Sequence, residues 1–226
     1  MSIAYSKEEI LNRIRAALQT AATRPEEIAE AYAAIPRNYA RAGKLDSQAR
    51  IVLMIERLRE YDAEVVECLP EEVPVAIASQ IKASGRLQFV LAPEIPEEWL
   101  SSAERKIDGI RWTRDHGLTT AAIEKMDGAI TEAFCGIADS GTVVLHHSPR
   151  EGRRVLTLLP DWHLCILRAS QIVETLPEYF ALSPDPPTLV TWISGPSATA
   201  DIEMTRIKGV HGPRFFRLIV VTDLAG

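Results

Sequence analysis

The sequence has little that would hold a metal ion. It contains three cysteines in 226 residues, Cys68, Cys135 and Cys165, and none of them forms a Cys-x-x-Cys pair. Structural zinc and iron–sulfur sites usually need four closely spaced ligands, so we expect no metal and interpret the cysteines as buried free thiols. His146 and His147 are adjacent and would face opposite sides of a strand, so they would not share a metal.

Excess positive charge and long apolar runs are also missing. The chain has 25 Lys and Arg against 31 Asp and Glu, a net charge of −6, and no basic block. Binding to a phosphate backbone relies on such a block, so we expect no nucleic acid partner. No apolar run reaches the roughly 20 residues of a membrane helix, and the polar segment 2–9 is unlike a signal peptide. We therefore expect a cytoplasmic protein without a membrane span.

The spacing of the apolar residues changes once along the chain. Residues 6–60 show the spacing of three successive helices, the last over about 47–61. From residue 63, strand-like and helix-like segments alternate, which indicates one mainly parallel sheet with helices on both faces. We therefore predict an α/β fold in two parts, an N-terminal helical extension over 1–62 and an α/β domain over 63–226.

The alternating part contains segments with defined predicted bounds. A helix over 73–84 would be closed by Gly85, because glycine readily adopts the left-handed conformation that ends helices. Two more helices are predicted over 96–105 and 171–180. Strands are predicted over 63–68, 87–91, 110–112, 143–145, 155–159, 164–167 and 215–221.

The motif with the most chemical content is S-G-P-S-A-T-A-D-I-E, which runs from Ser194 to Glu203. The segment before it, 187–193, is rich in β-branched and aromatic residues and predicts a buried strand. Ser197 or Thr199 would then cap a helix, whose first amides are free to bind an anion. We therefore expect a small anionic ligand at this turn.

Two acids and one histidine near this turn are candidates for chemistry. Asp201 and Glu203 lie two positions apart, so on a helix they would point to nearly opposite sides and would not form a catalytic pair. Alternatively, both lie early in the helix because its dipole favours negative charge there. His211, within the motif G-V-H-G-P, would act as a general acid or base, or bond a nearby carbonyl as a turn histidine.

A second small-residue turn precedes the strand predicted over 143–145. Asp139, Ser140 and Gly141 permit a sharp turn with a positive φ at the glycine, which would leave hydroxyls and amides pointing one way. An ordinary structural turn is the alternative. A third element is L-P-D-W-H over 159–163, where an acid, an indole and an imidazole enter a strand, unless it is a surface turn that half-buries the indole.

Together these elements resemble the lactate utilization protein C family, whose proteins contain the LUD domain. The matches are I-A-D-S-G-T-V-V-L over 137–145, L-P-D-W-H over 159–163, and the motifs over 194–203 and 209–213, in the order and spacing of the family. Asp139 stands where the family usually has Glu. The resemblance implies a fold like that of ribose-phosphate isomerase, glucosamine-phosphate deaminase and CoA transferases.

The resemblance also implies a role in oxidising L-lactate to pyruvate beside iron–sulfur subunits, which fits a chain without clustered cysteines. We expect a non-redox subunit or accessory protein without a cofactor; the alternative is a free-standing enzyme of the sugar-phosphate isomerase, CoA-transferase or folate cyclo-ligase type. Whether the chain catalyses a reaction or forms a homo-oligomer stays open. The candidate catalytic residues are Asp139, Glu203 and His211. The candidate ligand-binding residues are Ser140, Gly141, Thr142, Ser194, Gly195, Pro196, Ser197, Thr199, Asp201 and Gly212.

Overall fold

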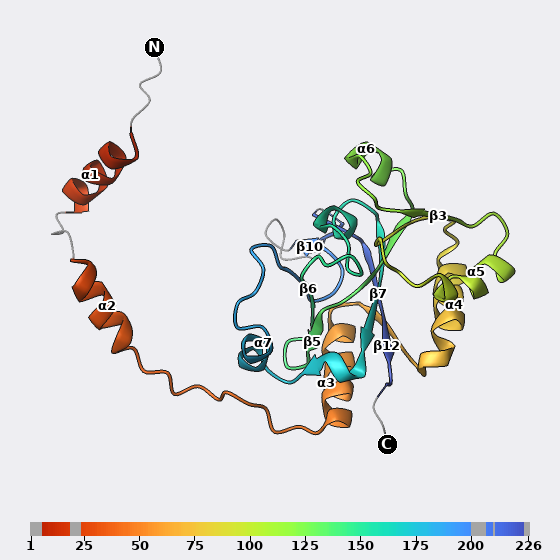
Figure 1. The fold of residues 1–226 in the computed structure, drawn as a ribbon, viewed down its shortest axis with the longest axis horizontal. Coiled ribbons are helices and arrows are strands. Elements are labelled where there is room, and N and C mark those ends of the chain that lie inside the picture. Colours follow the sequence, from red (N-terminus) through yellow and green to blue (C-terminus); the bar gives the residue numbers. More distant parts are fainter. Residues whose placement is uncertain (1–5, 19–23, 200–206, 210, 224–226) are drawn as a thin grey trace, which may run out of the picture. The chain divides into compact units, whose positions relative to one another are not determined.

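The protein has two units that are described separately. The computed structural model describes residues 6–18, 24–199, 207–209 and 211–223. The N-terminal unit spans Met1–Tyr39 and the C-terminal unit spans Ala40–Gly226. Figure 1 labels the helices and strands in chain order. Within the described residues, every helix is too short or too polar to cross a membrane.

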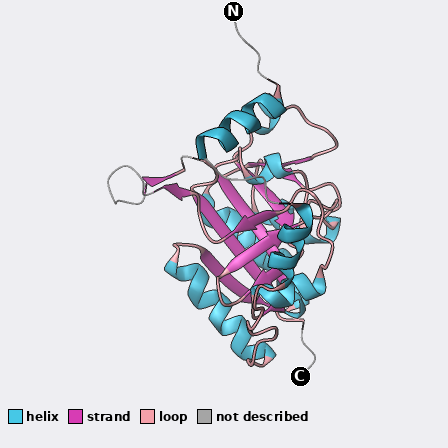
Figure 2. Ribbon diagram, turned by 90° about the vertical axis from the view of Figure 1, so that its left-hand side faces the viewer, coloured by secondary structure: helices cyan, strands magenta, loops and turns pink. Residues whose placement is uncertain are grey.

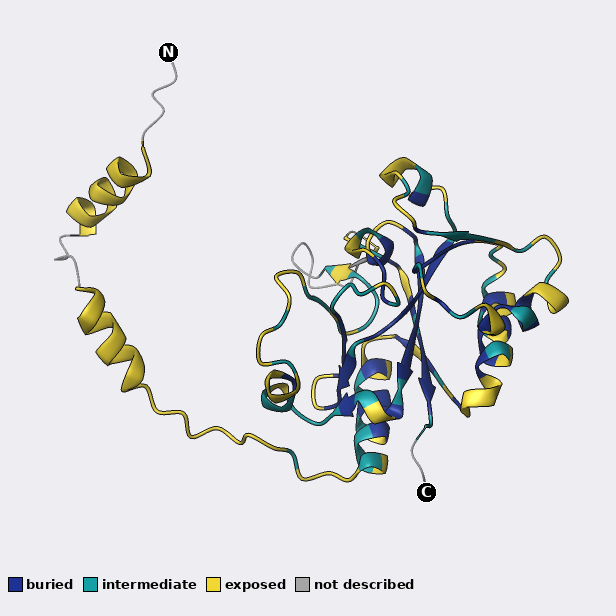
Figure 3. Cartoon of the chain, in the orientation of Figure 1, coloured by how far each residue is buried: buried dark blue, intermediate teal, exposed yellow. Residues whose placement is uncertain are grey.

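The N-terminal unit contains two helices, as the helical spacing predicts. α1 spans Lys7–Leu18 and α2 spans Pro25–Ala33. A proline suits the first position of α2, because the missing N–H would have no partner within the helix there. Neither helix contains a buried residue, and both are coloured as exposed in Figure 3. The apolar stripes predicted for these helices therefore face solvent: Ile10, Leu11, Ile14, Leu18, Ile28, Tyr32 and Ile35.

A six-stranded parallel sheet lies at the centre of the C-terminal unit, and it confirms the predicted α/β class. Its strand order is β1-β12-β7-β4-β2-β3, and every neighbouring pair is parallel. Side chains alternate between the faces, so β7 places Leu164 on one face and Cys165 on the other. The strands are β1 Glu64–Cys68, β2 Gln88–Leu91, β3 Arg111–Arg114, β4 Gly128–Glu132, β7 Trp162–Arg168 and β12 Phe215–Val221.

Helices cover both faces of this sheet (Figures 1 and 2). α4 and α5 pack on the face of Leu164, whereas α3 packs on the face of Cys165. α4 ends at Gly85, whose φ of 66° is the left-handed conformation predicted for it. α3 lies within the C-terminal unit, although the sequence grouped it with the extension over 1–62. The helices are α3 Ser47–Glu60, α4 Val73–Ser84, α5 Ser101–Lys106 and α6 Thr120–Ile123.

A second sheet of four strands corrects the prediction of a single sheet. Its order is β8-β5-β6-β9, where β6 runs antiparallel to both of its neighbours and β8 runs parallel to β5. Only two residues, Ala133 and Phe134, separate β4 from β5, so the chain passes directly from one sheet into the other. The strands are β5 Cys135–Ile137, β6 Thr142–Leu145, β8 Ile172–Val173 and β9 Thr191–Ile193.

Three predicted elements were wrong in type, extent or burial. Residues 155–159 do not form a strand, because the 3₁₀ helix η3 (Arg154–Thr157) occupies most of that segment. The helix predicted over 171–180 is divided into β8, which pairs with β5, and a shorter helix α7 (Leu176–Leu182). The strand predicted over 187–193 is the short edge strand β9, which is not buried, since its middle residue is 42% exposed.

Candidate functional site

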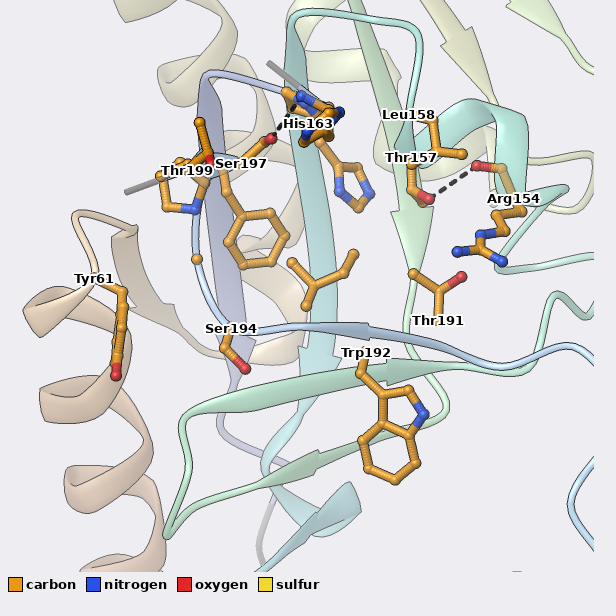
Figure 4. Close-up of a pocket in the computed structure, with 18 residues that line it drawn as sticks. Tyr61, Arg154, Thr157, Leu158, His163, Thr191, Trp192, Ser194, Ser197 and Thr199 are labelled. Atoms are coloured by element: carbon orange, nitrogen blue, oxygen red, sulfur yellow. Dashed lines mark hydrogen bonds between the residues drawn. The ribbon is translucent and has the colours of Figure 1, made fainter. Parts of the chain in front are cut away.

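A pocket of about 520 Å³ lies where the two sheets meet, at the amino ends of β7 and β12. We call it the main pocket (Figure 4). Its volume is within the range of about 300–1,000 Å³ that is usual for small-molecule sites. Open parallel sheets commonly bind ligands at the carboxyl ends of their strands, so this pocket lies at the opposite edge. Its lining comes from the α3–β1 turn, η3, β7, β9, β10 (Ala198–Thr199), the segment 211–213 and β12.

The described lining of the main pocket is cationic or neutral. It contains one arginine, two histidines and several hydroxyl groups, and it includes no Asp or Glu. Arg154 is exposed, and it has no ion-pair partner among the residues that the structure describes. A guanidinium without a carboxylate beside it, in a chain with a net charge of −6, gives this lining a local positive charge.

The prediction of a helix capped by Ser197 was wrong, whereas a helix capped by Thr199 would lie outside the described residues. Ala198–Thr199 form strand β10, which pairs antiparallel with β11 (Ile207–Lys208). Ser197 is bonded across to later residues: its N–H donates to the Pro213 carbonyl at 2.9 Å, and its Oγ accepts from the His211 N–H at 3.2 Å. The Ser197 amide is therefore not free to bind an anion. Asp201 and Glu203 lie outside the described residues.

The two glycine turns meet at one place, the end of α3. Gly141 has a φ of 58°, and a Cβ there would lie 2.6 Å from the Arg57 Cβ and 3.0 Å from the Leu58 nitrogen. Gly195 has a φ of 107°, and a Cβ there would lie 2.9 Å from the Tyr61 carbonyl oxygen. Both positions therefore need glycine for the backbone conformation and for the close approach to α3.

A row of hydroxyls connects these turns. Thr142 Oγ1 lies 2.7 Å from Ser140 Oγ and 2.8 Å from Ser194 Oγ. However, Ser140 and Thr142 line a different hollow of about 360 Å³, which we call the side pocket. Trp192 lines both pockets. The structure thus brings the two predicted halves of the site into contact but assigns them to separate pockets.

The other candidate residues fall on one pocket or the other. Asp139 is exposed, lines the side pocket, and donates its N–H to the Glu174 carbonyl at 2.9 Å. His211 is exposed and lines the main pocket. The candidates that line the main pocket are Ser194, Gly195, Pro196, Ser197, Thr199, His211 and Gly212.

The motif over 159–163 has a structural role and a role in the pocket. Asp161 accepts bonds from Arg214 at 2.5 Å and from Arg86 at 3.0 Å. Burial alone would raise the pKa of Asp161, but the bonds from these two guanidinium groups lower it below its ordinary value. Trp162 is fully buried, whereas His163 lines the main pocket. The half-buried tryptophan that the sequence allowed is therefore not found.

His163 is the buried titratable group of the main pocket. Only 1% of its surface is exposed, and burial lowers the pKa of its imidazole to about 3, so the ring is neutral at ordinary pH. Nε2 lies 2.9 Å from Thr131 Oγ1. Nδ1 is closed to solvent and has no hydrogen-bond partner among the described residues. An unpaired buried polar atom is uncommon in native proteins, and here it belongs to a pocket residue.

Thr191 enters the main pocket with its hydroxyl held by a second histidine. Thr191 Oγ1 lies 2.7 Å from His147 Nε2, and His147 Nδ1 lies 2.9 Å from the Gly152 carbonyl oxygen. His147 has a φ of 62°, which is uncommon for a residue with a side chain. The Glu151 carboxylate accepts its N–H at 3.0 Å and also the N–H of His146. These bonds fix the strained residue in place.

The sequence did not identify three residues of this pocket as ligand-binding. Arg154 lies just before the strand predicted over 155–159 and was not singled out, and Thr191 was counted only as part of the strand predicted over 187–193. His163 was noted within L-P-D-W-H but given no role. Several other arginines of the C-terminal unit are paired with an acidic side chain, whereas Arg154 has no such partner among the described residues. This difference depends on which residues the fold brings together, so the sequence alone does not reveal it.

The interpretation of the cysteines as buried free thiols is confirmed. Cys68, Cys135 and Cys165 are all buried and form no disulfide. Burial raises the pKa of Cys68 to about 11 and those of Cys135 and Cys165 to about 12. The described residues include no group of three His, Cys, Asp or Glu side chains that could hold a metal ion. The expectation that the protein binds no metal stays a prediction.

Comparisons with known proteins agree on one family. The LUD domain model matches residues 51–221. The chain is 36% identical to lactate utilization protein C of Deinococcus radiodurans over 226 aligned residues, which cover 97% of each chain. It is 31% identical to lactate utilization protein C of Anoxybacillus flavithermus, over 70% of this chain and 74% of that protein.

A solved structure extends this agreement to the fold. The crystal structure of a DUF162 family protein from Deinococcus radiodurans is similar with a TM-score of 0.62 and 30% sequence identity. The match covers 79% of this chain and 99% of that one. With the model matched from α3 to β12 and a relative aligned along nearly its whole length, this protein belongs to the LUD domain family.

Proposed function

We propose that this protein is a component of an L-lactate utilisation system and that it binds a small anionic ligand in the main pocket. The relatives named lactate utilization protein C support the first half, since one of them aligns with 97% of the chain. The lining of the main pocket supports the second half.

The observation that carries the ligand proposal is the position of Arg154. It lines a pocket without a described acidic residue and has no described ion-pair partner. A guanidinium binds a carboxylate through two parallel hydrogen bonds, and charged bonds of this kind are about twice as strong as neutral ones. The anion site thus rests on a side chain rather than on the helix start that the sequence suggested.

In this proposal the chain is a non-redox subunit without a cofactor of its own, and iron–sulfur subunits of the same system carry the electrons. The cysteines support this division of roles. Burial raises the pKa of each thiol, and a protonated thiol is a poor metal ligand.

The test is the affinity of the purified protein for L-lactate, pyruvate and inorganic phosphate by isothermal titration calorimetry. We expect Arg154→Gln to weaken carboxylate binding by about tenfold or more, because a charged hydrogen bond is lost. Arg105→Gln is the matched control, since Arg105 is exposed on α5 and does not line the pocket. Equal affinities of the two variants and the unchanged protein would contradict the anion site.

A second candidate function is favoured by the size of the main pocket. At about 520 Å³ it exceeds what lactate, with six non-hydrogen atoms, would fill. An enzyme acting on a sugar phosphate, a CoA thioester or a folate-like substrate would use more of that volume. Thermal-shift measurements with ribose 5-phosphate, glucosamine 6-phosphate, coenzyme A and folate test this reading. A larger stabilisation by one of these compounds than by lactate would favour the enzyme over the accessory subunit.

A further inference from the structure

We propose that the main pocket recognises the hydroxyl group of its ligand, and so prefers a 2-hydroxy carboxylic acid to the corresponding 2-oxo acid. This inference rests on the proposed function, because it assumes that Arg154 holds the carboxylate of such a ligand. It goes further by naming the ligand class. The pocket side chains already use some of their donors and acceptors within the protein, and this determines what they can offer a ligand.

The hydroxyl proton of Thr191 is engaged by His147. The Gly152 carbonyl oxygen can only accept, so His147 Nδ1, 2.9 Å away, carries a proton and donates it. A neutral imidazole that donates from Nδ1 can only accept at Nε2. The Thr191 hydroxyl, 2.7 Å from Nε2, therefore donates its only proton to His147. What Thr191 offers the pocket is the lone pairs of its oxygen.

The orientation of His147 makes this assignment firm. The backbone N–H of His147 donates to the Glu151 carboxylate at 3.0 Å, and both nitrogens of its ring are hydrogen-bonded. Glu151 is itself buried and also accepts from Ser148 Oγ at 2.6 Å. The ring cannot turn over without breaking both ring bonds. The Thr191 hydroxyl is thus pre-organised as an acceptor before any ligand arrives.

A second polar atom is available at His163. Nε2 of its ring lies 2.9 Å from Thr131 Oγ1, which is also 3.6 Å from Cys165 Sγ. Nδ1 is the ring atom without a described partner. Because Nδ1 is closed to bulk solvent, only a group inserted against the His163 ring satisfies it.

Thr191 therefore supplies an acceptor to the main pocket, and Arg154 supplies the cation (Figure 4). A 2-hydroxy acid has a carboxylate for Arg154 and an O–H to donate to Thr191. A 2-oxo acid would place carbonyl lone pairs against the lone pairs of Thr191. A site built from such groups discriminates against the ligand that leaves them unpaired.

The test compares matched acids: L-lactate with pyruvate, and 2-hydroxybutyrate with 2-oxobutyrate, by titration calorimetry at mildly alkaline pH. We expect the hydroxy acid of each pair to bind about 10- to 100-fold more tightly, the range expected for one unpaired polar group. Thr191→Val, which removes the acceptor without changing the shape, should reduce that ratio to near one. The matched control is Thr113→Val on β3, which does not line the pocket.

His147→Asn is a second route to the same result if Thr191→Val does not fold. The Asn amide can still donate to the Gly152 carbonyl but is too short to accept from Thr191. The Thr191 proton is then free to donate to an oxo group, so the preference should narrow or reverse. The ratio of the two affinities is the readout, because a merely structural role would weaken both acids alike. Equal binding of both acids, or tighter binding of the oxo acids, overturns this inference and leaves the anion site intact. Failure of all four acids to bind overturns both proposals.

Discussion

The turn over 139–142 and the turn over 194–197 are alike in sequence and support but differ in what they line. Each contains a glycine with a positive φ that rests against the end of α3, and their hydroxyls are in contact. The first lines the side pocket with the acidic Asp139, whereas the second lines the main pocket with Arg154. The two motifs meet because they share a support, while the difference in charge between the linings is the reason that we place the proposed anion in the main pocket.

The largest expected effect comes from filling the space between these turns and α3. Gly141→Ala and Gly195→Ala should each lower the free energy of unfolding by about 2–5 kcal/mol, since left-handed strain costs roughly 1–2 and overpacking about 1–3 kcal/mol. Gly85→Ala is the control, because its φ of 66° is similar and nothing lies within 4 Å of the added Cβ. It should show the strain alone. Urea unfolding measures all three; equal losses would mean that contact with α3 is unimportant.

The next effect is a pH dependence of the free energy of unfolding that arises from His163, which lines the main pocket and not the side pocket. Burial lowers the pKa of folded His163 to about 3, while in the unfolded chain it is near 6.5. Between these two pKa values His163 is protonated in the unfolded state but not in the folded state. The free energy of unfolding therefore falls as the pH drops from about 6.5 towards 3. The slope from this one group is at most about 1.4 kcal/mol per pH unit.

His163→Gln should remove that slope, and His116→Gln should leave it unchanged, because His116 is exposed. Denaturant titrations at a series of pH values measure both variants. An unchanged slope in His163→Gln would mean that acid sensitivity arises elsewhere in the protein.

A smaller effect is expected from placing a negative charge on each turn. Ser197→Asp puts a carboxylate in the main pocket and should weaken lactate binding by about tenfold through like-charge repulsion. Ser197→Asn controls for shape, since it can still accept the His211 N–H. Ser140→Asp on the side pocket should change binding little. Calorimetric titration would contradict the assignment if Ser140→Asp were the more damaging variant.

The smallest effect concerns Asp139, which the sequence offered as a catalytic candidate. It is exposed and lines the side pocket, not the main pocket of the proposed anion site. Asp139→Asn should therefore change the free energy of unfolding by no more than about 0.5 kcal/mol and leave lactate affinity unaltered. A loss of affinity in this variant would show that the two pockets act together.

Much of the sheet was predictable because its strands follow the hydrophobic pattern closely. β12 is almost purely apolar, and α4 ends at the glycine that closes it. β4 was missed because Gly128–Glu132 includes a glycine, a threonine and a glutamate, and all five are buried. Burial of that glutamate is tolerated through its bond with Arg150, 18 residues later, which no local pattern reveals.

The candidate site was predictable only in part, for a related reason. Ser197 has a hydroxyl that suits a helix cap, but the same hydroxyl serves a turn closed by His211. Choosing between these outcomes depends on residues 14 to 16 positions away. What Thr191 and His163 can offer a ligand depends on their hydrogen bonds. The groups involved, His147, Thr131 and Cys165, lie on other parts of the fold.

The position of α3 under both glycine turns bears on how short this protein can be made. Its buried side chains belong to the same core as β7 and β12, and the residue that ends it, Tyr61, lines the main pocket. A truncated chain that starts at residue 63, the boundary suggested by the sequence, would lose one wall of the pocket and the support of both turns. The smallest fragment that retains the fold therefore begins before Asp46, whose side chain caps α3.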